Sequence, residues 1–129
     1  GFTHFMPSPE LTRPQLIGLS RGFGAAMIVN VFGRTPIMQL AHCPVKEYRG
    51  CRGCRGQAGM LSDGEGRSFP LENVRFREGY CLVRMLNSAV TDIREAFTAS
   101  GMEVYAAAET LDAYPDTPVT RGHWARAVD

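Results

Sequence analysis

The sequence predicts a mixed α/β fold, and three segments near its start carry the prediction. Residues 2–6 alternate as in a short strand, and residues 12–24 have helical character. Residues 25–33 form a near-continuous apolar run with β-branched members, which is typical of a strand buried on both faces. A strand, a helix and a second strand in this order make a βαβ unit.

Start and stop signals bound the helix at residues 12–24. Thr12 can cap its first turn, and Gln15 stands three residues later, at the spacing of a capping box. Gly22 and Gly24 favour an end to the helix, because glycine readily adopts the backbone conformation that closes one.

The middle of the chain predicts a loop followed by a hairpin. Residues 42–56, HCPVKEYRGCRGCRG, contain too much glycine for regular structure. Residues 59–76 contain the turn signal SDGEG between two short apolar segments, which predicts a β-hairpin. Residues 80–88, YCLVRMLNS, are predicted to form a further strand.

The C-terminal part predicts a helix, a strand and a tail. Residues 90–101 have the pattern of an amphipathic helix that ends at Gly101, and residues 102–110 favour a strand. The proline spacing of residues 111–129 argues against a long helix there. We therefore expect a single domain or fragment with three parts: a βαβ unit at 1–42, a Cys-rich loop and hairpin at 43–81, and a strand–helix–strand segment with an irregular tail at 82–129.

Composition excludes several classes of protein. The chain has 129 residues, 44% of them hydrophobic and 21% charged, as is ordinary for one globular domain or part of one. Its net charge of +1 gives no general reason to expect a nucleic acid or an anionic membrane as partner. No apolar run approaches the ~18 residues of a membrane span, and no signal peptide is recognisable. We expect a cytoplasmic protein without a membrane partner.

The start of the chain predicts a fragment. Gly1 begins on what resembles the middle of a strand, so we expect the N-terminal part of the same chain to be a missing partner. Strand edges left exposed in this way would favour a homodimer of the fragment.

The four cysteines are the strongest chemical signal. Seven residues separate Cys43 from Cys51, two separate Cys51 from Cys54, and twenty-six separate Cys54 from Cys81. Four thiolates are the full ligand set of tetrahedral zinc or of a 4Fe–4S cluster. A two-residue gap lets two sulfurs reach one metal from a tight turn, which Gly53 eases. The spacing predicts a site for zinc or a 4Fe–4S cluster with all four as ligands.

Three other interpretations of the cysteines stay open. They can be free and unrelated, since four in 129 residues is a modest number. They can form disulfides, although nothing indicates an oxidising compartment. Cys51 and Cys54 can form a thioredoxin-like dithiol, although the pair does not open a helix after a strand.

Basic residues surround the cysteines, namely Lys46, Arg49, Arg52 and Arg55. Such residues commonly make a solvated loop surface, and the alternative is contact with RNA or an anionic substrate. A non-catalytic RNA-binding module is therefore a second functional hypothesis.

Six short segments come in one order along the chain: SPEL at 8–11, FGRTPIMQLAHCP at 32–44, CRGC at 51–54, LSDGEGRSFPL at 61–71, YCLVRMLNS at 80–88 and VTRGHWARAV at 119–128. Together they resemble the collagenase-like peptidases, a family of unassigned catalytic type. The resemblance covers nearly the whole chain and corresponds to the C-terminal part of the family's core region.

This resemblance implies a fragment of a (β/α) barrel with an inserted Cys-containing loop and β-hairpin. It also implies the family's nominal activity, a peptidase or hydrolase acting on a peptide substrate. Relatives in the family hold a 4Fe–4S cluster with such cysteines and hydroxylate a ubiquinone precursor or a ribosomal RNA base. An Fe–S dependent hydroxylase or RNA-modification component is therefore the alternative.

The residues themselves show no self-contained peptidase site. No H-E-x-x-H pattern is present, and the three histidines are far apart in the sequence. Catalytic candidates are the proton carriers Glu10 and His123 and the anion holders Arg34 and Arg121. The structural alternative makes Glu10 a helix-start charge and the two arginines ion-pair partners. Trp124 is expected to be a packing anchor.

Overall fold

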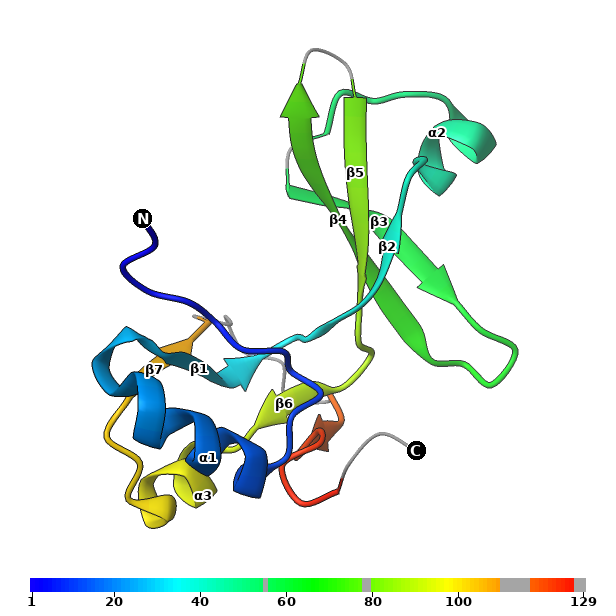
Figure 1. Ribbon diagram of the computed structural model, residues 1–129. Helices are drawn as coiled ribbons and strands as arrows, with labels where there is room; N and C mark the ends of the chain where they lie inside the picture. Colours follow the sequence, from blue (N-terminus) through cyan, green and yellow to red (C-terminus); the bar gives the residue numbers. More distant parts are fainter. Residues whose placement is uncertain (55, 78–79, 110–116, 127–129) are drawn as a thin grey trace. The chain divides into compact units, whose positions relative to one another are not determined.

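The computed structural model describes residues 1–54, 56–77, 80–109 and 117–126 (Figure 1). The chain divides into two compact units. The discontinuous unit comprises residues 1–33 and 89–129, and the inserted unit comprises residues 34–88. Each contains a four-stranded sheet, and helices accompany both, so the prediction of a mixed α/β fold is confirmed. The described strands do not close a barrel.

The sheet of the discontinuous unit has the strand order β7-β1-β6-β8. β1 pairs in parallel with β7 and antiparallel with β6, and β6 pairs in parallel with β8. The elements of this unit are α1 (Arg13–Phe23), a short 3₁₀ helix η1 (Gly24–Ala26), β1 (Ile28–Gly33), β6 (Val90–Asp92), α3 (Arg94–Ser100), β7 (Tyr105–Ala108) and β8 (Val119–Thr120).

The opening strand of the predicted βαβ unit is reduced to one residue pair. Phe5 forms an isolated parallel bridge with Met27, and the helix α1 lies between these two residues in the sequence, as expected. Its N–H donates to the carbonyl of Ala26 at 2.8 Å, and its carbonyl accepts from the N–H of Ile28 at 2.9 Å. Pro7 follows two residues later and has no N–H with which to extend such a ladder.

Helix α1 begins and ends near the predicted residues. The backbone N–H of Thr12 donates to Oε1 of Gln15 at 2.8 Å, which is the side-chain-to-backbone bond of a capping box. The helix ends at Phe23, one residue short of the predicted limit, and the chain tightens there into η1.

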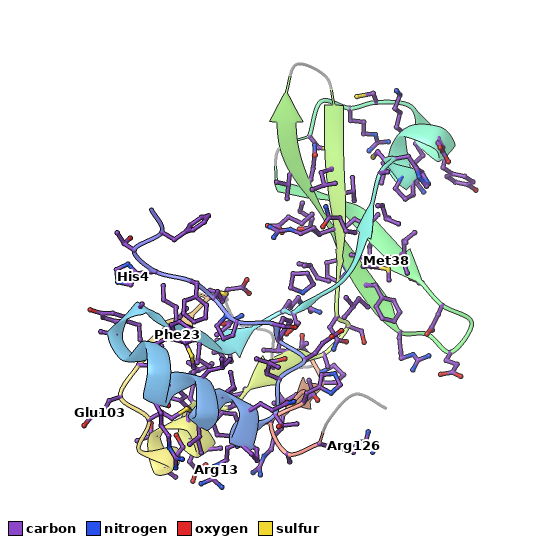
Figure 2. All side chains as sticks on the ribbon, viewed as in Figure 1. His4, Arg13, Phe23, Met38, Glu103 and Arg126 are labelled. Atoms are coloured by element: carbon purple, nitrogen blue, oxygen red, sulfur yellow. The ribbon has the colours of Figure 1, made fainter. Side chains whose placement is uncertain are left out.

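The core of the discontinuous unit lies between α1, α3 and the sheet (Figure 2). Strand β1 is not buried on both faces, and that prediction was wrong. Val29 and Val31 are buried, whereas Ile28 and Asn30 between them are only half-buried. The alternation arises because successive side chains of a strand point to opposite faces, and Val29 and Val31 are on the face that packs against the core with Leu16 of α1. The core side chains are Leu16, Met27, Val29, Val31, Ile93 and Trp124.

The predicted helix at residues 90–101 is shorter, and its first residues form β6 instead. Val90 and Thr91 pair with β8, and the N–H of Ile93 donates to the carbonyl of Val31 at 2.9 Å. These long-range backbone bonds satisfy groups that a first helical turn would leave unpaired. Gly101 ends α3 in the left-handed conformation, with φ of 68°, as predicted.

The Asp92–Arg94 pair should make a pH-dependent contribution to stability. The Arg94 guanidinium donates to both carboxylate oxygens of Asp92, at 2.9 and 2.6 Å, and this lowers the carboxyl pKa below 3.8. The stabilisation is therefore present above pH 3.8 and is lost as the pH falls through the lowered pKa of the folded state. Urea unfolding at neutral pH should show that Asp92→Asn costs about 0.5–1 kcal/mol.

A matched control isolates the pair from the loss of charge alone. Glu95 lies in the first turn of α3 and is exposed, so Glu95→Gln removes the same charge from the same region. An equal loss of stability in the two variants would contradict the specific role of the Asp92–Arg94 pair. So would a deficit in Asp92→Asn that persists at a pH where the wild-type carboxyl is protonated.

The inserted unit is a fully antiparallel sheet with the strand order β2-β5-β4-β3 and one short helix. The hairpin predicted around SDGEG is confirmed, because β3 and β4 pair from Ser62 and Ser68 outward. Residues 42–56 were predicted to be a loop, but α2 occupies part of them; a proline in its first turn fits the helix, and Gly50 ends it at φ of 78°. The elements are β2 (Pro36–Leu40), α2 (Pro44–Arg49), β3 (Gly56–Ser62), β4 (Ser68–Arg77) and β5 (Tyr80–Leu86).

Asp63 organises the hairpin turn. Its Oδ1 accepts the backbone N–H groups of Glu65 and Arg67, each at 2.9 Å, and its Oδ2 accepts from Nε of Arg67 at 2.6 Å. The hydrogen bond from Arg67 is the main reason why the pKa of the Asp63 carboxyl is lowered.

No described helix is long and apolar enough to cross a membrane.

Candidate functional site

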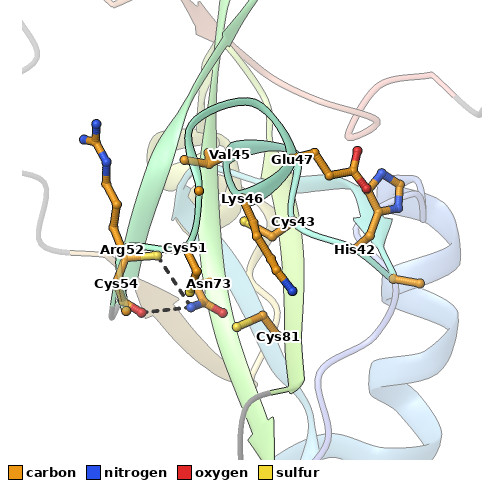
Figure 3. Close-up of a pocket in the computed structure, with 13 residues that line it drawn as sticks. His42, Cys43, Val45, Lys46, Glu47, Cys51, Arg52, Cys54, Asn73 and Cys81 are labelled. Carbon is orange, nitrogen blue, oxygen red and sulfur yellow. Dashed lines mark hydrogen bonds between the residues drawn. The ribbon is translucent and has the colours of Figure 1, made fainter.

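All four cysteines line one cavity of the inserted unit (Figure 3). Cys43 is the residue before α2, Cys51 and Cys54 lie in the loop between α2 and β3, and Cys81 lies on β5. The cavity has a volume of about 310 Å³. Its lining consists of Ala41, His42, Cys43, Val45, Lys46, Glu47, Gly50, Cys51, Arg52, Gly53, Cys54, Asn73 and Cys81.

Local backbone geometry folds the loop back over the sheet. Gly50 and Gly53 have positive φ angles of 78° and 63°, which only glycine adopts without strain. Gly53 stands between Cys51 and Cys54, so its positive φ changes the course of the backbone between the two cysteines. Cys81 reaches the same cavity because β5 is paired with β4 in the sheet beneath the loop.

The four thiols line the same cavity, but their sulfurs do not form a ligand set around one point. All four are free, with Cys51 exposed and the other three half-buried. Within the described part of the chain, no three histidine, cysteine, aspartate or glutamate side chains stand close enough together to hold a metal ion. Binding a metal would therefore require sulfurs to move closer together, and Cys51 is exposed on a loop outside the helices and strands.

Asn73 is a wall residue of this cavity that sequence reasoning missed. It lies on β4, is only 8% exposed, and its Nδ2 donates to the carbonyl of Cys54 at 2.8 Å and to its Sγ at 3.7 Å. Its Oδ1 is buried without a hydrogen-bond partner among the described residues. The signal in the sequence was an amide at a strand position that shares a face with Leu71, where an apolar residue is expected.

The donor set of the cavity suits a thiophilic metal. Thiolate sulfur selects zinc, copper(I) and iron–sulfur clusters over hard cations such as Mg²⁺. The cavity has room for an ion or a cluster. In its wall, the buried Oδ1 of Asn73 has no hydrogen-bond partner among the described residues, and such an atom in a folded protein calls for an explanation. These observations fit a metal centre, with the sulfur movement described above as its requirement.

Comparisons with protein-family models, with curated proteins and with solved structures find no match. The resemblance to the collagenase-like peptidases therefore rests on the six sequence segments alone.

The four catalytic candidates do not come together in the cavity. Its lining includes none of Glu10, Arg34, Arg121 and His123. Glu10 is exposed in the turn before α1, and Arg121 is exposed after β8. Nδ1 of His123 lies 3.3 Å from the carbonyl oxygen of Arg126, which is a local contact within the same segment.

Arg34 contacts backbone carbonyls of its own unit. Its Nη1 donates to the carbonyl of Asn87 at 2.7 Å and to that of Ser88 at 2.8 Å. Next to it, the N–H of Asn87 donates to the carbonyl of Thr35 at 2.9 Å. Arg34 thus joins the two ends of the inserted unit through hydrogen bonds to backbone carbonyls.

Replacing Arg34 should destabilise the protein even when no metal or other ligand is bound. Arg34→Met removes both charge-assisted hydrogen bonds and should lower the free energy of unfolding by about 1–3 kcal/mol. Urea unfolding followed by circular dichroism measures the change. Arg21→Met, an exposed change on α1, is the control and should cost much less. Equal stabilities of the two variants would contradict the role assigned to Arg34.

Proposed function

We propose that the inserted unit binds a thiolate-coordinated metal centre. The observation that carries this proposal is that four cysteines from three separate places in the chain line one cavity. A loop before α2, the turn after it and the strand β5 each contribute. The proposed ligands are Cys43, Cys51, Cys54 and Cys81, and the group they would hold is zinc or a 4Fe–4S cluster.

The ligand count decides what chemistry such a centre can supply. Four protein thiolates close the coordination sphere of zinc, so no position is left for a water nucleophile of the kind that metallopeptidases use. A 4Fe–4S cluster would instead supply electron transfer. The proposal therefore favours a structural or electron-carrying centre over a hydrolytic one.

The wider protein that we propose is a collagenase-like one, of which this chain is the C-terminal part of the core. The order of the six segments supports it, and parallel pairing of β1 with β7 is compatible with a fragment of a (β/α) barrel. Peptidase activity is the nominal function of that family. Fe–S dependent hydroxylation or RNA modification agrees better with a closed set of four thiolates.

Metal content and absorption together test this proposal. The chain is purified anaerobically, its zinc, iron and sulfide are measured, and its visible spectrum is recorded. Iron and acid-labile sulfide with broad visible absorption identify a cluster, whereas one stoichiometric zinc without colour identifies a zinc site. Protein that contains neither metal, and takes up neither when reduced and reconstituted, would contradict the proposal.

A second function, binding of single-stranded RNA, is supported by the surface next to the cavity. Lys46 and Arg49 lie on α2, Arg52 lies in the following loop, and all three are exposed. Between them Tyr48 is 86% exposed, and an aromatic ring beside cations is a stacking platform for an unpaired base. Arg55, the fourth basic residue predicted here, lies outside the described residues.

Salt dependence and two charge-matched variants test RNA binding. The triple change Arg49→Gln, Arg52→Gln and Arg55→Gln should weaken binding and flatten its dependence on salt. The control is an equal change of charge at other arginines, Arg13→Gln, Arg21→Gln and Arg126→Gln. Equal RNA affinity of the two triple variants would exclude the surface next to the cavity as the binding site.

A further inference from the structure

Asn73 occupies a position that the sheet would otherwise fill with an apolar side chain. Side chains alternate along β4, so Asn73 faces the same way as Leu71, which is fully buried. Its partner across the sheet is Val83, which is also fully buried. The surroundings on the strand therefore favour a residue such as valine or leucine.

The amide is also only partly satisfied in these surroundings. Nδ2 has its partners at Cys54, but Oδ1 is buried without one in the described part of the chain. A buried polar atom without a hydrogen bond destabilises a fold. A polar residue in an environment that favours an apolar one is expected mainly at functional sites, where the residue serves binding or catalysis at a cost in stability.

The bonds that Asn73 does make are directed at a single cysteine. The same Nδ2 group approaches both the backbone carbonyl and the sulfur of Cys54 (Figure 3). The first contact fixes the end of the loop next to β3, and the second places an N–H donor on the sulfur. Hydrogen bonds to ligand sulfurs orient them and tune the electronic properties of the metal.

We propose that Asn73 is a positioning residue of the metal centre, which holds Cys54 as a ligand and distinguishes its sulfur from the other three. This inference rests on the proposed function, because it assumes that the four cysteines bind one metal. Cys54 is then held in place before the metal arrives, and the other loop cysteine, Cys51, closes onto it. The expected result is a centre with one hydrogen-bonded sulfur on the β4 side.

Cobalt binding provides a test that does not depend on any activity. The reduced 129-residue chain is titrated anaerobically with Co²⁺, and the thiolate-to-cobalt charge-transfer and d–d bands are followed. Asn73→Leu should bind Co²⁺ about 10- to 100-fold more weakly, as is typical when a partner of a metal ligand is lost. Its charge-transfer band should move to longer wavelength, because a sulfur without the N–H donor gives up electron density more readily.

Thermal unfolding of the metal-free protein separates this role from a role in folding. Asn73→Leu should be about as stable as the wild type without metal, since removal of the buried oxygen that lacks a partner offsets the lost hydrogen bond to the carbonyl of Cys54. Asn73→Ala is a second variant in case leucine does not fit the cavity wall. Asn30→Leu makes the same change on β1 of the discontinuous unit, and Co²⁺ binding should be unaffected by it.

The outcomes distinguish the two proposals. If Asn73→Leu and Asn73→Ala bind Co²⁺ with the affinity and the spectrum of the wild type, the assignment of Asn73 is overturned and the metal centre is left intact. Loss of the folded state in both variants would make Asn73 a residue of the fold and also overturn the assignment. A wild-type chain that takes up neither Co²⁺ nor, on reconstitution, zinc or iron would overturn the metal centre and, with it, the role of Asn73.

Discussion

Replacing Cys51 and Cys54 together with serine should lower the affinity of the chain for Zn²⁺ by about four to six orders of magnitude. Structural zinc sites with four ligands bind with about 10–16 kcal/mol, so two lost thiolates remove roughly 5–8 kcal/mol if the ligands contribute equally. Serine keeps the size of the side chain but does not provide a thiolate. Competition with a chromophoric chelator at constant pH measures the two affinities.

The control for this double variant lies between the two cysteines. Arg52→Ser introduces the same residue into the same loop and leaves all four thiols in place. It should bind Zn²⁺ almost as the wild type does. Equal affinities of the double variant and Arg52→Ser would show that Cys51 and Cys54 are not ligands.

The state of the double variant without metal distinguishes two kinds of centre. If the inserted unit folds only when zinc is bound, it should be unfolded in the double variant at zinc concentrations at which it is folded in the wild type. A folded double variant that has lost only metal affinity would indicate that the sheet of β2 to β5 is stable by itself. Circular dichroism with and without zinc makes this comparison.

Trp124→Ala should cause the largest loss of stability among core substitutions in the discontinuous unit. Trp124 is 7% exposed and belongs to the core cluster with Leu16 and Ile93. Its carbonyl also accepts from the N–H of Arg13 at 2.9 Å, so the segment is tied to the start of α1. Removing the indole leaves a cavity, and such changes cost about 3–5 kcal/mol.

Urea unfolding followed by circular dichroism is the appropriate measurement, because Trp124 is the chain's single tryptophan and its fluorescence disappears with it. Trp124→Phe keeps an aromatic ring in the core and should cost clearly less than Trp124→Ala. A loss below about 1 kcal/mol for Trp124→Ala would mean that the segment after β8 is not part of the stable core.

Local elements followed closely from the sequence because the interactions that define them are local. The turn signal SDGEG gave its hairpin through Asp63, whose carboxylate binds N–H groups two and four residues away. The bond between Thr12 and Gln15 spans three residues, and Gly101 ends α3 through its own backbone conformation. Each of these can be recognised in a short window of sequence.

Elements that depend on distant partners were predicted less well. The residues of β6 have a helical pattern, but pairing with β1 and β8 makes them a strand. The strand expected at residues 2–6 is one bridge, and α2 forms inside a stretch that its glycines marked as a loop. The division after residue 33 and before residue 89 likewise follows from which strands pair.

The same distinction holds for the candidate site. The sequence by itself determined that four thiols are present, that two residues including Gly53 separate Cys51 from Cys54, and that cations flank them. Only the tertiary structure decided that Cys81 lines the same cavity, because the pairing of β5 with β4 brings it back across twenty-six residues. Only the tertiary structure gave Asn73 its place in the cavity wall, because its burial and its contact with Cys54 depend on sheet register and loop packing rather than on neighbouring residues.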